Sequence, residues 1–195
     1  MKNLFNRKLN RLLRMFVVAS VIFSFMVVIL PARTALGAVN TWTVGTGNWS
    51  NHGNWSLGHD PDATEDATFT GDLTGVTITI DAASQDCLNL DFSGASGNPT
   101  LAIGTNLLNC YGEIKVISTM NITGALPGGL YFNGNSATCK ITTNGLTLNT
   151  TLGLRAAFTG TVTLQDNYTS TKEIKPNGGT INTNNKIVNS VTFFV

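Results

Sequence analysis

The chain has 195 residues, 12% of them charged and 8% aromatic, with a net charge of +1. The charge is uneven, because residues 38–195 hold six basic and eleven acidic residues and so carry a net charge of −5. The basic residues of that part stand singly, so they cannot neutralise a run of phosphates or hold an anionic membrane. Nucleic acids are therefore excluded as partners. Contact with a membrane is expected only through residues 1–37, if this N-terminal segment is not cleaved.

Residues 1–37 have the three parts of an export signal. Five basic residues and no acidic one lie between positions 2 and 14, and Met15–Leu30 is an apolar run interrupted only by two serines. Ala35 and Gly37 are the small residues of a cleavage site, so we predict a signal peptide cut after Gly37. An uncleaved anchor is the alternative, but a membrane span needs about 20 apolar residues. The rest of the chain is expected to be secreted or on the cell surface.

Residues 38–195 have the composition of a β-protein. They include 27 Thr and 19 Asn, and branched Thr suits a pleated strand while Asn and Gly suit turns. No stretch has the apolar period of 3.6 that an amphipathic helix requires. Short alternating segments, each followed within a few residues by a turn former, are Val76–Ile80, Leu88–Phe92, Leu101–Ile103, Leu146–Leu148 and Val162–Leu164.

The segment 38–68 differs from residues 69–195, because it holds all three Trp and both His of the protein. We predict that it forms a cap over the first coil of a repetitive fold, since large amphipathic rings can cover an open end. The alternative is that Trp42, Trp49 and Trp55 are exposed and stack on sugar rings as a binding platform.

An acidic loop comes after the last Trp. Asp60, Asp62, Glu65 and Asp66 place four carboxylates within seven residues, and carboxylate oxygens are ligands for Ca²⁺. The loop lacks the Gly and the terminal Glu of an EF-hand, so a solvated turn needs fewer assumptions. We predict no cofactor and keep Ca²⁺ as the alternative.

A Phe-x-Gly triplet recurs in the remainder of the chain. It begins at Phe69, Phe92, Phe132 and Phe158, and Tyr111-Gly112 fills the long gap as a degenerate copy. Unequal intervals near twenty residues are typical of a β-solenoid, whose turns vary in length while its strands stack. We expect the aromatic side chains to stack and each glycine to turn the chain out of its strand. The alternative fold is a β-sandwich.

Three cysteines, Cys87, Cys110 and Cys139, are separated by 23 and 29 residues, which matches no metal-binding motif. We predict buried reduced thiols that pack as small apolar side chains, with a single disulfide as the alternative.

The opening segment resembles the start of many bacterial surface β-solenoid proteins of the autotransporter-passenger-like and G8-like kinds. The residues that carry this resemblance are Trp42, Gly45, Gly47, Trp49, Trp55, Gly58, Pro61 and Asp66, and Gly160–Asp166 and Gly178–Lys186 look like coils of the same class. The resemblance implies a right-handed parallel β-helix over residues 69–195 and a secreted or surface role. That class has no fixed catalytic motif, so it transfers no site residue.

The charged residues of the coils do not form a recognisable catalytic motif. They are Asp81, Asp86, Asp91, Glu113, Lys115, Lys140 and Arg155. We expect the three aspartates to lie at turns on the outer face, and we predict that the protein is not an enzyme. The alternative, an enzyme of the polysaccharide-lyase type, would need Arg155 or a Lys within reach of two acids in one groove.

These observations predict an exported structural or adhesive surface module that binds a glycan or another surface protein passively. We predict that Val191–Val195, an apolar segment, forms a final strand. An uncovered last coil would be prone to association, so we expect that either a partner covers it, such as a second copy of the chain, or the natural protein continues as part of a larger surface protein.

Overall fold

The computed structural model describes residues 37–135 and 138–192, so the predicted signal peptide lies outside the described residues except for Gly37. Within the described part, no helix is long and apolar enough to cross a membrane. The chain from Gly37 onward forms one compact unit.

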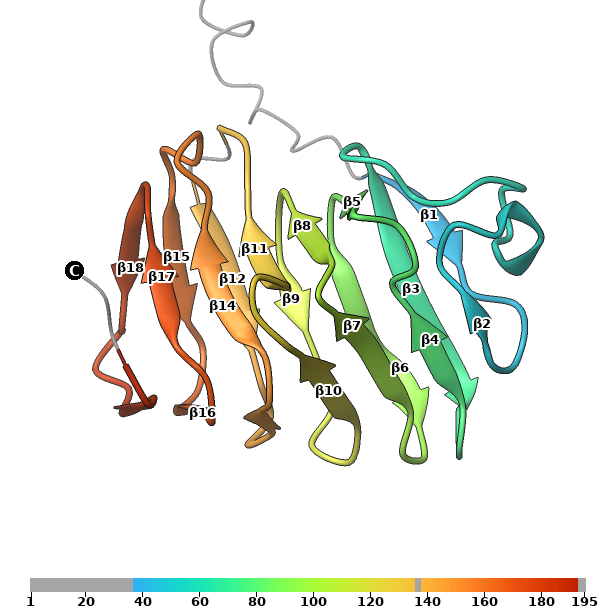
Figure 1. Cartoon of the computed structure of the whole chain (residues 1–195). Coiled ribbons are helices and arrows are strands. Elements are labelled where there is room, and N and C mark those ends of the chain that lie inside the picture. Colours follow the sequence, from blue (N-terminus) through green and yellow to red (C-terminus); the bar gives the residue numbers. More distant parts are fainter. Residues whose placement is uncertain (1–36, 136–137, 193–195) are drawn as a thin grey trace, which may run out of the picture. The chain divides into compact units, whose positions relative to one another are not determined.

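The chain winds through successive coils, and each coil contributes a strand to three faces in turn (Figure 1). The first face is a seven-stranded parallel sheet. Its strands, in order, are β1 (Ala38–Thr41), β3 (Glu65–Asp72), β6 (Leu90–Ser96), β9 (Ile114–Lys115), β12 (Thr138–Thr142), β15 (Thr161–Leu164) and β18 (Thr180–Asn182).

The second face consists of two parallel sheets joined by a bridge between Thr123 and Asn149. The strands of the first of these sheets are β2 (Gly47–Asn48), β4 (Thr77–Thr79), β7 (Thr100–Gly104) and β10 (Asn121–Gly124). Those of the second are β13 (Thr147–Leu148), β16 (Tyr168–Ser170) and β19 (Val188–Asn189).

The third face is a five-stranded parallel sheet. Its strands are β5 (Ser84–Cys87), β8 (Leu107–Cys110), β11 (Gly129–Phe132), β14 (Thr151–Leu154) and β17 (Ile174–Pro176). In the first coil, the short 3-10 turn η1 (His52–Asn54) comes where later coils have a strand of this face.

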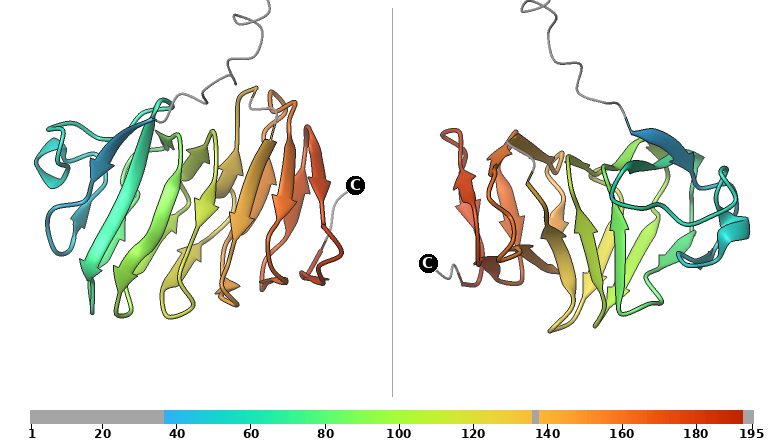
Figure 2. Two further views of the ribbon diagram at one scale, coloured as in Figure 1. Left: turned by 180° about the vertical axis from the view of Figure 1, so that it is seen from behind. Right: turned by 90° about the horizontal axis from the view of Figure 1, so that it is seen from above.

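This arrangement confirms the predicted all-β parallel β-helix. Strands of successive coils pair in parallel with their equivalents, except that β10 and β13 are joined only by the bridge between Thr123 and Asn149. The coils follow one another along the stack in chain order (Figure 2). A β-sandwich would require antiparallel sheets facing each other, so the alternative fold is wrong.

Along β4, β7, β12 and β15, buried side chains alternate with side chains that are at least partly exposed. On the second face, Ile78 lies beside Leu101 in register, and Leu101 lies beside Ile122; all three are fully buried. On the third face, Leu108, Leu130 and Leu152 form an equivalent column. Each such side chain contributes about 1.5–3 kcal/mol by leaving water. One coil alone would leave these side chains exposed, which is why the coils repeat.

The Phe-x-Gly triplets are not equivalent positions of the coils, so this part of the prediction is wrong. Phe69 and Phe92 stack on the first face, but Phe132 belongs to the third face, in register with Cys110. Phe158 follows β14. Gly71 has a left-handed φ of 79° yet remains paired within β3, so it does not turn the chain out of the strand.

The predicted cap segment contains the first coil itself, and the coils continue from Glu65 rather than from residue 69. After η1, the chain runs along the free edge of β1. The amide of Thr43 donates to the carbonyl of Asn54 (2.9 Å), and the amide of Ser56 donates to the carbonyl of Thr41 (2.9 Å). These bonds cover backbone groups that an edge strand would otherwise expose.

The opposite end is built differently. β17, β18 and β19 are the last strands of their sheets, and no further strand covers them among the residues that the structure describes. Ile187 and Val191, which flank β19, are 60% and 72% exposed.

Candidate functional sites

The three tryptophans are core residues of the first coil. Trp42, Trp49 and Trp55 are only 4%, 0% and 3% exposed. Trp55 lies at the centre, with its ring centroid 5.1 Å from that of Trp42, 4.8 Å from that of Trp49 and 5.7 Å from that of Phe69. Its indole N–H donates to the Trp49 carbonyl (2.7 Å). Because the rings are buried against one another, they do not present a platform on which sugars could stack.

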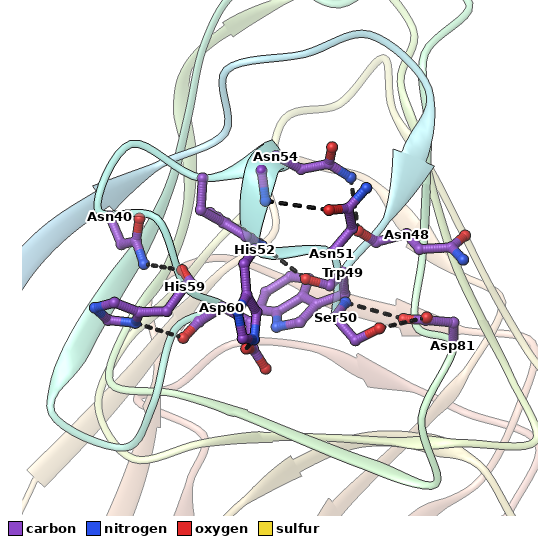
Figure 3. A network of polar contacts seen from close by, with 12 residues as sticks. Asn40, Asn48, Trp49, Ser50, Asn51, His52, Asn54, His59, Asp60 and Asp81 are labelled. Atoms are coloured by element: carbon purple, nitrogen blue, oxygen red, sulfur yellow. Dashed lines mark hydrogen bonds and ion pairs between the residues drawn. The ribbon is translucent and has the colours of Figure 1, made fainter.

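Polar residues near this aromatic cluster hold the segment 48–60 in place by hydrogen bonds (Figure 3). Ser50 donates to Asp81 from its amide (3.0 Å) and from its hydroxyl (2.6 Å), which ties the first coil to the second. Asn40 donates to the carbonyl of His59 (2.8 Å) and accepts from the amide of Leu57 (3.1 Å).

The four carboxylates proposed as Ca²⁺ ligands have separate partners. Between side-chain atoms, Asp60 lies 3.1 Å from His52, and Glu65 lies 3.5 Å from His59. The carboxylate of Asp62 accepts from the hydroxyl of Thr64 (2.7 Å), and that of Asp66 accepts from the amide of Asn89 (2.6 Å). Across residues 37–135 and 138–192, no group of three or more His, Cys, Asp or Glu could hold a metal ion.

The structure favours the protonated form of His59 in this loop. The hydrogen bond to the Asp60 carbonyl raises the pKa of His59, and the negative charges of Glu65 and Asp62 raise it further. When His59 is protonated, it forms an ion pair with Glu65, whose carboxylate lies 3.5 Å away.

The first face carries a cluster of charges that the sequence does not show to be neighbours. Glu113 lies 2.8 Å from Lys115 and 3.1 Å from Lys140, measured between carboxylate oxygens and ammonium nitrogens. Asp91 is in register with Lys115 on the adjacent strand. Asp86 and Asp91 lie on β5 and β6, so the prediction that they occupy turns is wrong; Asp81 does follow a strand, β4.

The electrostatics of this cluster are those of ion pairs. The hydrogen bond from Lys115 lowers the pKa of Glu113, and the same bond raises the pKa of Lys115. Burial raises the pKa of Asp66, which lies in the same neighbourhood. A lysine that acts as a general base needs a lowered pKa. The pKa of Lys115 is raised instead.

The second face presents two columns of outward side chains across successive coils. The first column is Thr77, Thr100, Asn121, Thr147, Thr169 and Asn189, and the second is Asn48, Thr79, Ala102, Thr123, Asn149 and Thr171. None of these twelve positions is charged, and all but Ala102 are Thr or Asn. Parallel-sheet geometry spaces the side chains by about 4.8 Å between coils and about 6.6 Å along each strand.

The third face has two adjoining hollows, of about 450 and 460 Å³, which share Arg155 and Asn177. The guanidinium carbon of Arg155 lies 5.6 Å from the centre of the Tyr131 ring. Gly153 allows this packing, because a Cβ there would lie 2.2 Å from the ring. Lys175 lines the larger hollow and pairs with Glu173 at 2.6 Å. No ion pair of the described residues involves Arg155, so neither hollow has the base flanked by two acids that a lyase-type site would need.

All three cysteines are buried, as predicted. Cys87 and Cys110 are paired in register on β5 and β8, with their sulfur atoms 3.6 Å apart. Burial raises the pKa of the Cys87 thiol. Cys139 lies on β12 of the first face, and its thiol donates to the carbonyl of Tyr111, the residue that follows Cys110, over 3.8 Å.

No family model matches the sequence, and no curated protein or solved structure matches it. A functional proposal therefore depends on the fold and on the side chains that the fold arranges.

Proposed function

We propose that this protein is an exported, non-enzymatic surface module that uses its second face to bind a repetitive, uncharged glycan surface. The observation that carries the proposal is the pair of uncharged Thr/Asn columns, which continue in register from coil to coil. The leader and the resemblance to bacterial surface solenoid proteins support the location.

The chemistry of the two columns suits a neutral polymer. Threonine hydroxyls and asparagine amides both donate and accept hydrogen bonds, as sugar hydroxyls do. A face without ions binds such a surface without removing charged groups from water, which would be costly. Each contact is weak, but contacts repeated along one rigid sheet add through effective concentration.

The rigidity of the columns follows from the backbone. The inward neighbours of these residues, such as Ile78 and Leu101, are fully buried, so the strands that carry the columns are fixed by the core. Binding then orders few protein groups, and the entropic cost of association stays low.

The charged residues of the first face support a passive role. The charges of the first face are arranged as ion pairs on an open sheet, and Lys115 has a raised pKa. We therefore propose that these charges stabilise neighbouring coils and that binding of the glycan is not followed by chemistry.

The test is co-sedimentation of the purified protein with insoluble cellulose, chitin and mannan. The variant Thr100→Lys/Thr123→Lys places two charges on the second face, and Thr163→Lys is the matched control on β15 of the first face. We expect the double variant to lose at least about tenfold in affinity, equivalent to about 1.4 kcal/mol, and the control to bind like the wild type. Unchanged binding by the double variant, with its folding verified by circular dichroism, would refute the proposed surface.

A further inference from the structure

The third face offers a second site, separate from the columns of the second face. We propose that the two hollows around Arg155 bind a carboxylate-bearing sugar of an acidic glycan. This inference goes beyond the proposed function, and it does not require the second face to bind anything.

The charge of Arg155 is available to a ligand. Arg155 directly follows β14 and is exposed, and it makes no ion pair with any described residue. Its contact with the Tyr131 ring, at 5.6 Å, orients the guanidinium by a cation–π interaction. Such a contact uses the face of the guanidinium and leaves its N–H groups able to donate to a ligand. A planar guanidinium matches the two oxygens of a carboxylate.

The surroundings of Arg155 are positive although residues 38–195 are acidic overall. Lys175 lies on the neighbouring strand, in register with Gly153, and its single acidic partner is Glu173. The residues that line the two hollows include Arg155 and Lys175 and no acidic residue, whereas residues 38–195 carry −5 overall. A local positive potential attracts anions to this face.

The polar lining suits sugar hydroxyls. Asn177 lines both hollows, next to Arg155 in each lining. Asn133 and Asn106 line one hollow each, and their side-chain amides also donate to Tyr111 and to the carbonyl of Ile80. Volumes of about 450 and 460 Å³ lie within the range of small-molecule sites. Because the hollows share two residues, one short oligosaccharide could occupy both, with its carboxylate at Arg155.

The proposal is tested by calorimetric titration of the purified full chain with a galacturonic acid trimer and with the neutral galactose trimer. Arg155→Gln removes the charge, Arg155→Lys keeps the charge without the planar fork, and Lys140→Gln removes a positive charge from the first face as a control. We expect the acidic trimer alone to bind, Arg155→Gln to weaken it at least about tenfold, Arg155→Lys to weaken it less, and Lys140→Gln to leave it unchanged.

Equal binding of the two trimers, or unchanged binding by a folded Arg155→Gln variant, would overturn the inference. The variant Thr100→Lys/Thr123→Lys separates the two proposals. It should still bind the acidic trimer, whatever its affinity for neutral polysaccharides, and loss of the acidic trimer in this variant would place that ligand on the second face instead.

Discussion

The rings of Phe69 and Phe92 lie parallel, with their planes 2° apart and their centroids separated by 4.0 Å. They come from adjacent strands of the first face, where the pairing of β3 with β6 shifts register between Thr68 and Thr70. The two rings thus remain stacked across an irregular stretch of sheet. The pair Phe132 and Phe158 is tilted by 45° at 6.1 Å, and it comes from a strand and a loop.

These two geometries predict different couplings. In double-mutant cycles of Phe→Leu substitutions, we expect Phe69 and Phe92 to be coupled by about 0.5–1.5 kcal/mol of unfolding free energy, because stacked rings gain energy beyond the area they bury. Phe132 and Phe158 serve as the control pair and should couple more weakly. Urea unfolding of the four single and two double variants measures both values, and equal couplings would contradict the difference in ring geometry.

The buried tryptophans predict a structural role. Trp55→Ala should lower the unfolding free energy by about 3–5 kcal/mol, because it leaves a large cavity between the other aromatic rings of the first coil. Leu57→Ala, at an exposed position two residues later, should change stability by less than about 0.5 kcal/mol. Thermal unfolding distinguishes the two outcomes. If Trp55→Ala retained full stability and lost glycan binding, the tryptophans would be a binding platform after all.

The sequence predicted the repetition because a short alternating segment with one apolar face needs a neighbour to bury it. The sequence did not predict the register, that is, which residues of successive coils lie side by side. The first column of the second face recurs at intervals of 23, 21, 26, 22 and 20 residues, so no fixed period reveals it. The Phe triplets suggested a false register for the same reason. The hollow at Arg155 depends on Gly153 facing Tyr131 across two strands, and that pairing is visible only in the fold.

The first face predicts two opposite dependences of stability on pH. The pKa of Glu113 is lowered in the folded state, so its stabilising contribution is present above its ordinary value of 4.5 and is lost as the pH falls through the folded pKa. The pKa of Asp66 is raised, so its contribution is largest below its ordinary value of 3.8 and is lost as the pH rises through the folded pKa.

Urea unfolding between about pH 3 and about pH 7 measures both effects. Glu113→Gln should make the acid loss of stability shallower, whereas Asp66→Asn should make it steeper. Parallel curves for the wild type and both variants would show that neither carboxyl interacts as described.

The buried thiols should not react with thiol reagents in the folded protein. A thiol-specific reagent should label none of Cys87, Cys110 and Cys139 under native conditions, because burial excludes the reagent and disfavours the reactive thiolate. In denaturant without reductant, three thiols should react, as counted by intact mass. Only one reactive thiol would indicate a disulfide, and Cys87 with Cys110 would be the pair to examine first.

The exposed apolar residues of the last coil predict self-association. Ile187 and Val191 leave apolar surface beside β19, which has no further strand on its outer edge among the described residues, so we expect a concentration-dependent dimer in sedimentation velocity. Ile187→Lys/Val191→Lys should reduce the dimer, while Leu126→Lys, at another exposed apolar position, should not. A monomer at all concentrations, or equal effects of both variants, would remove the last coil as an interface.

The binding proposal depends on the alignment of the two columns of the second face. Spin-label distances along the second column, which contains Asn48 and Asn149, test this alignment most directly. Cysteines introduced at Asn48 and Asn149, four coils apart by register, should be separated by about 19 Å in a background without the native cysteines. Moving the second label to Thr171 should add one strand spacing, about 4.8 Å. Two distances that are equal, or a second one that is shorter, would contradict the stacked column.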